Sequence, residues 1–489
     1  MNFTKIITVV QQLEEQFPVE SWTVDDRPLW PYLRVQLYFS IREEEEQKPK
    51  HPASAKEKSP SLINKLANKL EAALERRARL SKKASSVDYL FLSLSHYRED
   101  VNGIGYDRHA DVLREHLHEK GKTSTFIDVP VSRRAHPQPF LSDGYLVDTD
   151  LNASAISVDD PQFRLPGYAQ FLLKLADHLN EEKQITFDES HLAARFRQQE
   201  KFYHALKNFF KNENLKAAFI VCYYSEQGFA LARFCEERGI PLVDIQHGMQ
   251  HHPCYRAWTK KSSYTLSFGP SHFWVWDEPN AKPVRAWADS ITDGPAVVEA
   301  GYLWKSKLAT LTSDEDKTIR SRADQPVILL TLPTYPVVLD ENLVETIRST
   351  SGELKWLVRA HPRLAEQQAE CARQIGEDVI SVDDVRASST APLGNLIAEA
   401  DIHLTWESTV IVEAADQGVP SIAIESDALE IFPAVAASGL ITFSTTAQLA
   451  ARLKNWDFST RPTPAAIPTL GDALKIATAR LEESGVRCS

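Results

Sequence analysis

The chain has 489 residues, of which 43% are apolar and 25% charged, with a formal net charge of −12. This length exceeds the roughly 250–300 residues that one hydrophobic core serves, so two domains are expected. The acidic balance disfavours wholesale nucleic-acid binding, which needs a broad basic face. No apolar run reaches the roughly 18 residues of a membrane span, and the first, Ile6–Val10, is too short for a signal-peptide core of about 7–15 residues. We therefore expect a cytoplasmic protein.

Residues 1–85 read as a helical N-terminal extension. An exposed linker, Glu43–Pro60, is rich in Glu, Lys, Pro and Ser and lacks aromatic residues. Residues 61–83 return to helical spacing, with Leu62, Leu66 and Leu70 on one face and lysines and arginines on the other. Such a helix can lie on an anionic membrane surface, here the inner face of the cytoplasmic membrane. Alternatively, it can pack on the protein with its charged face in solvent. The sequence leaves both interpretations open.

Residues 86–310 alternate between strands and helices, which indicates a parallel, doubly wound sheet. The run Val87–Leu94 is continuously apolar, as expected for a strand buried on both faces. A helix over 107–120 follows it. Further strands are predicted over 123–127, 217–222, 241–245 and 273–276. Together these elements predict an N-terminal Rossmann-like domain.

Residues 311–465 repeat the pattern as a second Rossmann-like domain. Its strands are predicted over 326–331, 355–360, 379–382, 401–405 and 420–424, and its helices over 342–349, 364–375, 392–400 and 409–417. Residues 466–489 contain a last helix, over 471–484, that is expected to pack back on the first domain. Ligands of such sheets bind at the carboxyl ends of the strands, so the central cleft between the domains is the predicted site.

A polar loop in the second domain combines groups suited to a phosphate and a ribose. Glu407, Ser408 and Thr409 follow a predicted strand and open a helix, whose free N–H groups favour an anion. Glu413, one turn on, is placed to reach ribose hydroxyls. The alternative is that Ser408 caps the helix and Glu413 is a solvated residue.

Two other strand ends in the second domain carry compatible groups. Arg359 and His361 follow one predicted strand, and Thr334 follows its neighbour. These residues, with the loop at Ser408, predict the binding site of a donor nucleotide. His361 by itself is more often a packed or capping histidine.

In the first domain, a predicted strand delivers His247 to its carboxyl end between Gln246 and Gly248. A histidine there is placed to act as a general base on a hydroxyl group. Glu226 follows the preceding strand and is a second catalytic candidate, or a helix N-terminal carboxylate without a catalytic role. Glu99 and Asp100 are weaker candidates of the same kind. A metal is not expected, because no HExxH pattern accompanies His247, and the five cysteines are scattered without a CxxC pair.

These motifs resemble a family of bacterial surface-carbohydrate and capsule biosynthesis proteins, in the GT-B group of glycosyltransferases. The resemblance rests on Leu29–Arg34, Gln246–Gly248, Phe273–Trp276, Arg359–Pro362 and Glu407–Thr409 with Glu413. It implies that His361, Ser408 and Thr409 hold the donor phosphate. The Gln-His-Gly element is similar to the Trp-His-Gly of teichoic-acid glycerophosphotransferases, which implies that His247 is the base. The acidic base motif of bacterial sialyltransferases is absent at Gln246.

We therefore expect an α/β, GT-B-like enzyme that transfers a sugar from a nucleotide-sugar, CMP-linked in one version, to a surface polysaccharide or lipid-linked glycan. The nucleotide-sugar is a substrate, and no cofactor is expected. One alternative is a CDP-alditol phosphotransferase. Another is a non-catalytic scaffold of a glycan assembly complex.

Overall fold

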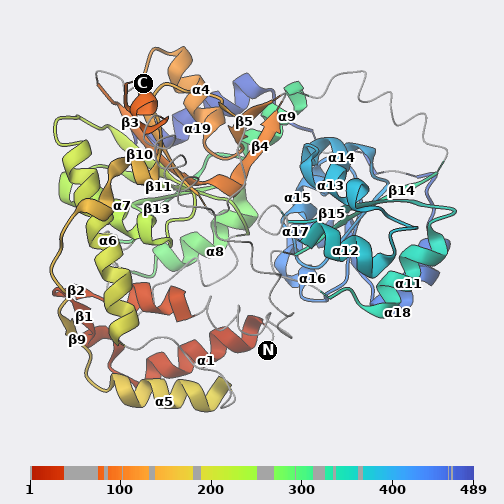
Figure 1. The fold of residues 1–489 in the computed structure, drawn as a ribbon, viewed down its shortest axis with the longest axis horizontal. Coiled ribbons are helices and arrows are strands. Elements are labelled where there is room, and N and C mark those ends of the chain that lie inside the picture. Colours follow the sequence, from red (N-terminus) through yellow and green to blue (C-terminus); the bar gives the residue numbers. More distant parts are fainter. Residues whose placement is uncertain are drawn as a thin grey trace, which may run out of the picture.

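The computed structural model describes residues 3–37, 75–81, 86–101, 103–130, 138–179, 189–249, 269–291, 293–311, 325–333, 338–361, 367–460, 462–463 and 466–488. The predicted linker over 43–60 lies outside these residues, as does most of the predicted basic helix. Figure 1 shows two α/β bodies side by side, with the helices α1 (Phe3–Gln16) and α5 (Tyr168–Leu179) below the first. The predicted fold class, two Rossmann-like parallel-sheet domains with a helical N-terminal extension, is confirmed.

The first domain is built on seven parallel strands, in the order β13–β12–β11–β10–β3–β6–β8. Their bounds are Tyr89–Leu94 (β3), Ser124–Val129 (β6), Tyr145–Val147 (β8), Ala217–Ile220 (β10), Leu242–Ile245 (β11), His272–Val275 (β12) and Ala296–Glu299 (β13). The helices are α4 (Asp111–Glu119), α5 (Tyr168–Leu179), α6 (Glu189–Phe209), α7 (Glu226–Arg238), α8 (Glu278–Ala288) and α9 (Leu303–Leu311). The strand order reverses between β3 and β10, where such sheets bind their ligands.

The second domain has five parallel strands, in the order β15–β14–β16–β17–β18. They span Val327–Thr331 (β14), Lys355–Arg359 (β15), Ile402–Thr405 (β16), Ser421–Ala423 (β17) and Ile441–Phe443 (β18). The helices are α11 (Glu341–Thr350), α12 (Gln367–Ile375), α13 (Val382–Thr390), α14 (Leu393–Glu399), α15 (Val410–Asp416), α16 (Ala428–Ile431), α17 (Pro433–Ala437) and α18 (Thr446–Lys454). Here the order reverses between β14 and β16.

Short elements complete the first domain. The described residues include two small three-stranded sheets. One consists of β1 (Thr23–Val24), β2 (Arg27–Pro28) and β9 (Phe163–Arg164). The other consists of β4 (Arg98–Val101), β5 (Ile104–Asp107) and β7 (Gln138–Pro139). The 3-10 turns are η1 (Val19–Ser21), η2 (Ser95–Tyr97), η3 (Asp148–Leu151) and η4 (Ala153–Ala155). The β4–β5 hairpin was not predicted, and the helix expected from residue 107 begins only at Asp111.

The N-terminal extension is held by an aromatic cluster and a buried carboxylate. Helix α1 (Phe3–Gln16) brings Glu14 to Trp30 Nε1, at 2.6 Å, and to Arg34 Nε, at 2.8 Å. The Trp22 ring packs edge-on against Trp30 and Phe171, with ring centroids 5.7 and 5.0 Å apart. The motif Leu29–Arg34 therefore anchors the extension to α1 and α5.

The described part of the basic helix, residues 75–81, contacts the first domain. Arg79 Nε donates to the Asp150 carboxylate at 2.6 Å, and Arg76 donates to the Asp150 backbone oxygen. Two arginines of the predicted basic face are thus used inside the protein. No helix in the described part of the chain is both long and apolar enough to cross a membrane.

One predicted strand, over 379–382, is wrong. Ser381 instead begins α13: its Oγ accepts from Asp384 N–H, and the Asp384 carboxylate accepts from Ser381 N–H, both at 3.1 Å. This capping box satisfies the free N–H groups of the first helical turn. The short apolar stretch before it therefore enters a helix and does not join the sheet.

The C-terminal helix α19 (Leu470–Glu483) lies on the first domain, as the blue helix beside α4 and α9 in Figure 1 shows. Its buried face, including Leu481, joins the core of that domain. Beyond the helix, the Arg487 backbone oxygen accepts from the Tyr89 hydroxyl of β3 at 3.0 Å.

Candidate functional site

The two domains meet at Arg108, which lies between one carboxylate of each domain. Its Nη1 is 3.4 Å from Glu99 Oε1 in the first domain and 3.5 Å from Glu413 Oε1 in the second. Glu99 lies on β4, Arg108 directly follows β5, and Glu413 lies on α15. The β4–β5 hairpin therefore carries two charged groups to the second domain.

The turn that presents Arg108 is held by Asp107, the last residue of β5. The buried Asp107 carboxylate accepts from the N–H groups of His109 and Ala110, both at 2.9 Å, and from the Ser93 hydroxyl at 2.6 Å. Burial and the neighbouring Asp111 raise the pKa of Asp107 to about 6. Because Asp107 turns the chain, α4 starts late and Arg108 points to the domain contact.

Burial determines the charges at this contact. Glu413 is only 9% exposed. This burial raises the pKa of its carboxyl to about 7, although the positive charge of Arg108 acts to lower it. Burial and Arg108 together lower the pKa of His109 far below its ordinary value, so this imidazole is neutral. Its Nε2 accepts from Arg108 Nε at 3.2 Å. The Glu413 carboxyl therefore keeps its proton to a higher pH than an exposed glutamate does.

Three buried polar atoms around Arg108 have no hydrogen-bond partner among the described residues. They are Glu99 Oε2, Glu413 Oε2 and His109 Nδ1. Such atoms are rare in folded proteins, because each one costs the free energy of its lost hydration. With Nε2 accepting from Arg108, His109 Nδ1 is a donor. The Glu99 oxygen is an acceptor, and the Glu413 oxygen accepts when ionised and can donate when protonated. A ligand with hydroxyl groups, which both donate and accept, would satisfy all three.

His247 lies at the edge of this cluster. Its Nε2 is 3.0 Å from the Tyr224 hydroxyl, and its ring centroid is 5.4 Å from that of Tyr97 and 6.4 Å from that of His109. Two residues later, Met249 packs against an apolar cluster of the second domain that includes α15. The loop after β11 thus brings His247 to the domain contact, as its position at the strand end predicted.

Gln246 shapes that loop. Its Nε2 donates to the Gly248 backbone oxygen and to Asn280 Oδ1, both at 2.9 Å, and its Oε1 accepts from Trp276 N–H at 2.8 Å. The Trp276 ring in turn stacks on Tyr302 at 4.4 Å. Gln246 is therefore fully buried and positions His247 and Trp276.

A strained turn holds Tyr224 in place. Cys222 has a φ of +73°, a left-handed conformation that is unusual for a residue with a Cβ atom. The buried Asp244 carboxyl accepts from the N–H of Tyr223 at 3.2 Å and from that of Cys222. Burial raises the pKa of Asp244 well above its ordinary value. Asp244 on β11 thus fixes the loop that brings the Tyr224 hydroxyl to His247.

Arg359 and His361 follow β15 in the second domain. Arg359 Nη1 donates to the backbone oxygens of Ser388 and Ala391, at 2.8 and 2.6 Å, at the end of α13. The charge of Arg359 partly opposes the rise in the pKa of Glu413 that burial causes, so the two side chains lie on the same side of the domain. His361 is half-buried just beyond the strand.

Glu407, Ser408 and Thr409 form the predicted loop between β16 and α15. Ser408 Oγ accepts from Val410 N–H at 3.3 Å, which is the capping role considered as an alternative. Thr409 precedes the helix and makes no side-chain capping bond. The loop leads directly into α15, the helix that carries Glu413.

Glu226 is not brought to this cluster. Its carboxylate accepts from Arg195 Nε at 2.6 Å, Tyr32 Oη at 3.0 Å and Gln199 Nε2 at 2.5 Å. The residue joins α7 to α6 and to the N-terminal extension. Thr334 and the side chain of Asp100 lie outside the described residues.

Several residues at the contact had not been singled out from the sequence: Arg108, His109, Tyr224 and Tyr302. Tyr302 stacks on His109, with ring centroids 6.0 Å apart, and completes the aromatic wall. The position of Tyr224 directly after a strand was a usable indication. The positions of Arg108 and His109 depend on the hairpin, which no pattern indicated. Among the described residues, no group of three or more His, Cys, Asp or Glu is arranged to hold a metal.

Comparisons with known proteins identify similar folds. No family model and no curated protein matches the sequence. The chain is similar to the UDP-GlcNAc 2-epimerase of Neisseria meningitidis, solved with UDP-GlcNAc, at 15% identity over 81% of this chain and 100% of that one, with a TM-score of 0.47. It is similar to S. aureus MnaA, solved with UDP, at 13% identity over 82% and 98%, with a TM-score of 0.47. It is also similar to CalG4, the calicheamicin glycosyltransferase, at 12% identity over 82% and 95%, with a TM-score of 0.39. At these values the function has to be inferred from the residues of this chain.

Proposed function

We propose that the protein is a glycosyltransferase that binds a nucleotide-sugar where its two domains meet and transfers the sugar to a surface-glycan acceptor. The observation that carries the proposal is the set of three unsatisfied buried atoms on Glu99, His109 and Glu413 around the charge of Arg108. Hydroxyl groups of a ribose or sugar fit the three atoms, and a phosphate fits the arginine.

In this proposal the donor lies on the second domain. Glu413 accepts from ribose hydroxyls, and the loop at Glu407, Ser408 and Thr409 lies beside the nucleotide with Thr334, Arg359 and His361. Arg108 reaches from the first domain to the departing phosphate. Stabilising that charge in a buried site contributes much of the rate acceleration in reactions of this kind.

The acceptor lies on the first domain, beside His247. The acceptor oxygen forms a bond to the anomeric carbon, and the bond from that carbon to the phosphate oxygen breaks. The proton of the acceptor hydroxyl passes to the His247 imidazole, and the nucleotide leaves with the electron pair. The Tyr224 hydroxyl orients the imidazole. No metal is assigned a role, and peripheral binding to an anionic membrane stays part of the proposal.

The donor site is tested by thermal unfolding with CMP, CDP, UDP, GDP and dTDP. A nucleotide at 100 times its Kd raises the free energy of unfolding by about 2.7 kcal/mol. Arg108→Gln should abolish this increase. Arg386→Gln removes the same charge from an exposed position on α13 and should leave the increase intact. The absence of stabilisation by every nucleotide would refute the proposed donor site.

Product analysis then separates the reactions. Transfer of the sugar releases the nucleotide and lengthens the acceptor by one sugar, whereas a CDP-alditol phosphotransferase releases CMP and adds a phosphate with the alditol. An epimerase returns an isomer of the donor without an acceptor. The remaining alternative is a non-catalytic scaffold of a glycan assembly complex. It would be favoured if cells carrying His247→Ala or His361→Ala made as much glycan as wild type.

A further inference from the structure

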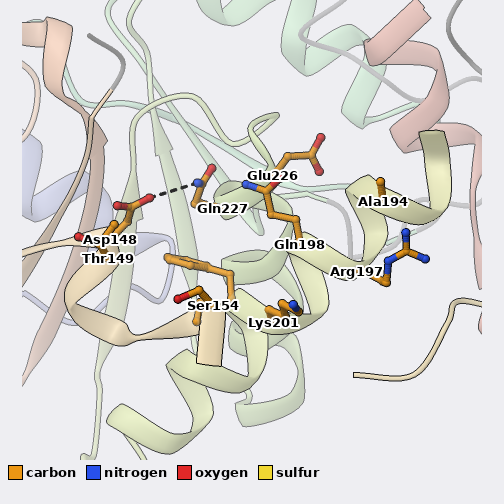
Figure 2. Close-up of a pocket in the computed structure, with 11 residues that line it drawn as sticks. Asp148, Thr149, Ser154, Ala194, Arg197, Gln198, Lys201, Glu226 and Gln227 are labelled. Carbon is orange, nitrogen blue, oxygen red and sulfur yellow. Dashed lines mark hydrogen bonds between the residues drawn. The ribbon is translucent and has the colours of Figure 1, made fainter. Parts of the chain in front are cut away.

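A cavity opens in the first domain, and its lining does not include Arg108. It has a volume of about 440 Å³ and lies between η3, η4, α6 and the start of α7. This volume falls in the range of about 300–1,000 Å³ typical of small-molecule sites. Figure 2 shows its walls, with Asp148 and Thr149 on one side and Gln198 and Lys201 of α6 on the other.

The lining is suited to hydroxyl groups. Gln227 Nε2 donates to Asp148 Oδ2 at 3.4 Å, as the dashed line in Figure 2 marks, which is long for a hydrogen bond. Burial raises the pKa of Asp148. The Gln198 amide, the Ser154 hydroxyl and the Phe202 ring complete the walls. A carboxylate, amides and a hydroxyl beside an aromatic ring are the groups that bind the hydroxyls and ring face of a sugar.

The charged side chains of the lining differ in whether they have a direct partner. Arg197 is paired with Asp160 at 2.6 Å, and the Glu226 carboxylate is paired with Arg195 at 2.6 Å. Figure 2 shows the Glu226 carboxylate turned away from Asp148. Lys201 has no ion-pair or hydrogen-bond partner among the described residues. Its ammonium group would bind a carboxylate or another acidic group of a ligand.

The turn before α7 and the first residues of that helix link the cavity wall to the proposed reaction site. Gln227 is three residues beyond Tyr224, whose hydroxyl is 3.0 Å from His247. We propose that this cavity binds an acidic oligosaccharide: a sugar unit of the growing acceptor, distinct from the unit that reacts. The assignment rests on the proposed function, because the acceptor is expected on this domain.

The test is calorimetric titration of the full-length protein with a uronate-containing hexasaccharide of hyaluronan, compared with uncharged maltohexaose. The acidic hexasaccharide should bind and maltohexaose should bind at least tenfold more weakly. Lys201→Gln should weaken binding of the acidic hexasaccharide about tenfold, as expected for loss of a hydrogen bond to a charged group. Lys211→Gln removes the same charge from an exposed position just beyond α6 and should have no effect.

A second variant blocks the cavity without removing a charge. Ala194 is an exposed residue that lines the mouth, so Ala194→Trp should abolish binding and Ala194→Ser should retain it. Equal binding by wild type, Lys201→Gln and Ala194→Trp would refute the subsite, as would preference for maltohexaose. Nucleotide stabilisation without hexasaccharide binding overturns the subsite alone. Hexasaccharide binding without nucleotide stabilisation overturns the donor site alone.

Discussion

At the scale of single residues, Glu413 combines burial with an ionisable group at a domain contact. In the unfolded chain its carboxyl has an ordinary pKa near 4.5, whereas burial raises the pKa to about 7 in the folded protein. Between these values the folded state retains a proton that the unfolded state has lost. The free energy of unfolding contributed by this group is therefore highest below pH 4.5 and falls as the pH rises to 7.

Glu413→Gln should remove this decline. The free energy of unfolding of the variant, relative to that of wild type, should rise by up to about 3 kcal/mol between pH 4.5 and pH 7. The reason is that one pKa unit corresponds to about 1.4 kcal/mol. Urea unfolding at a series of pH values measures the difference. Glu345→Gln, at an exposed position of α11, is the control and should run parallel to wild type. A constant difference between Glu413→Gln and wild type would show that the Glu413 carboxyl titrates normally.

At the scale of elements, helix α7 packs very close to the strained turn at Cys222–Tyr224 that precedes it. Gly228, in the first turn of α7, has no side chain, and a Cβ atom there would overlap the backbone oxygen of Tyr223. The helix can start so close to Cys222–Tyr224 only because this residue is glycine. The same closeness allows Ser225 Oγ to accept from Gly228 N–H at 3.0 Å.

Gly228→Ala should therefore lower the free energy of unfolding by about 1–3 kcal/mol, the usual cost of overpacking. Since the backbone of Tyr223 has to move, the variant should also weaken the Tyr224–His247 contact and reduce transfer activity. Gly471→Ala is the matched control, because Gly471 is also in a first helical turn and its Cβ would meet nothing within 4 Å. The control should be neutral or up to about 1 kcal/mol more stable. Equal effects of the two substitutions in denaturant unfolding would contradict the close approach.

At the scale of the whole molecule, the chain ends in the domain where it begins. Leu481 of α19 is fully buried in the first-domain core, whereas Ile476 of the same helix is 51% exposed. The second domain therefore lies as an insertion between α9 and α19. Its contact with the first runs through Arg108, Met249 and an ion pair of Lys305 with Asp416 at 2.5 Å.

Leu481→Ala should destabilise the first domain selectively. Loss of a buried leucine side chain costs about 2–5 kcal/mol, and amide hydrogen exchange should speed up in β3, β12 and β13. Exchange in β14–β18 should stay unchanged. Ile476→Ala, with an exposed side chain, should leave both domains unchanged. Faster exchange in the second-domain strands alone would contradict the placement of α19.

The central strands of both sheets were predictable because burial on both faces of a parallel sheet requires continuous apolar runs, as in β3 and β14. The short strands β8, β13 and β18 and the long helix α6 were not predicted. The strand end that carries His247, and the loop after β16 that leads to Glu413 on α15, followed from the same pattern. The capping box at Ser381 was a local feature that the reading of 379–382 as a strand overlooked. Glu226 was at the expected strand end, but the charge of Arg195 on a distant helix engages it.

Hydrophobic periodicity, encoded in each segment of the chain, thus determined by itself the two Rossmann-like domains and the edge of each sheet that carries polar residues. Only the tertiary structure decided which of those residues meet. Arg108 reaches Glu413 from 305 positions away because a hairpin extends to the domain contact, and Lys201 and Asp148 line one cavity because α6 packs beside η3. Pairing between distant charges depends on the positions of whole elements, which local sequence patterns do not specify.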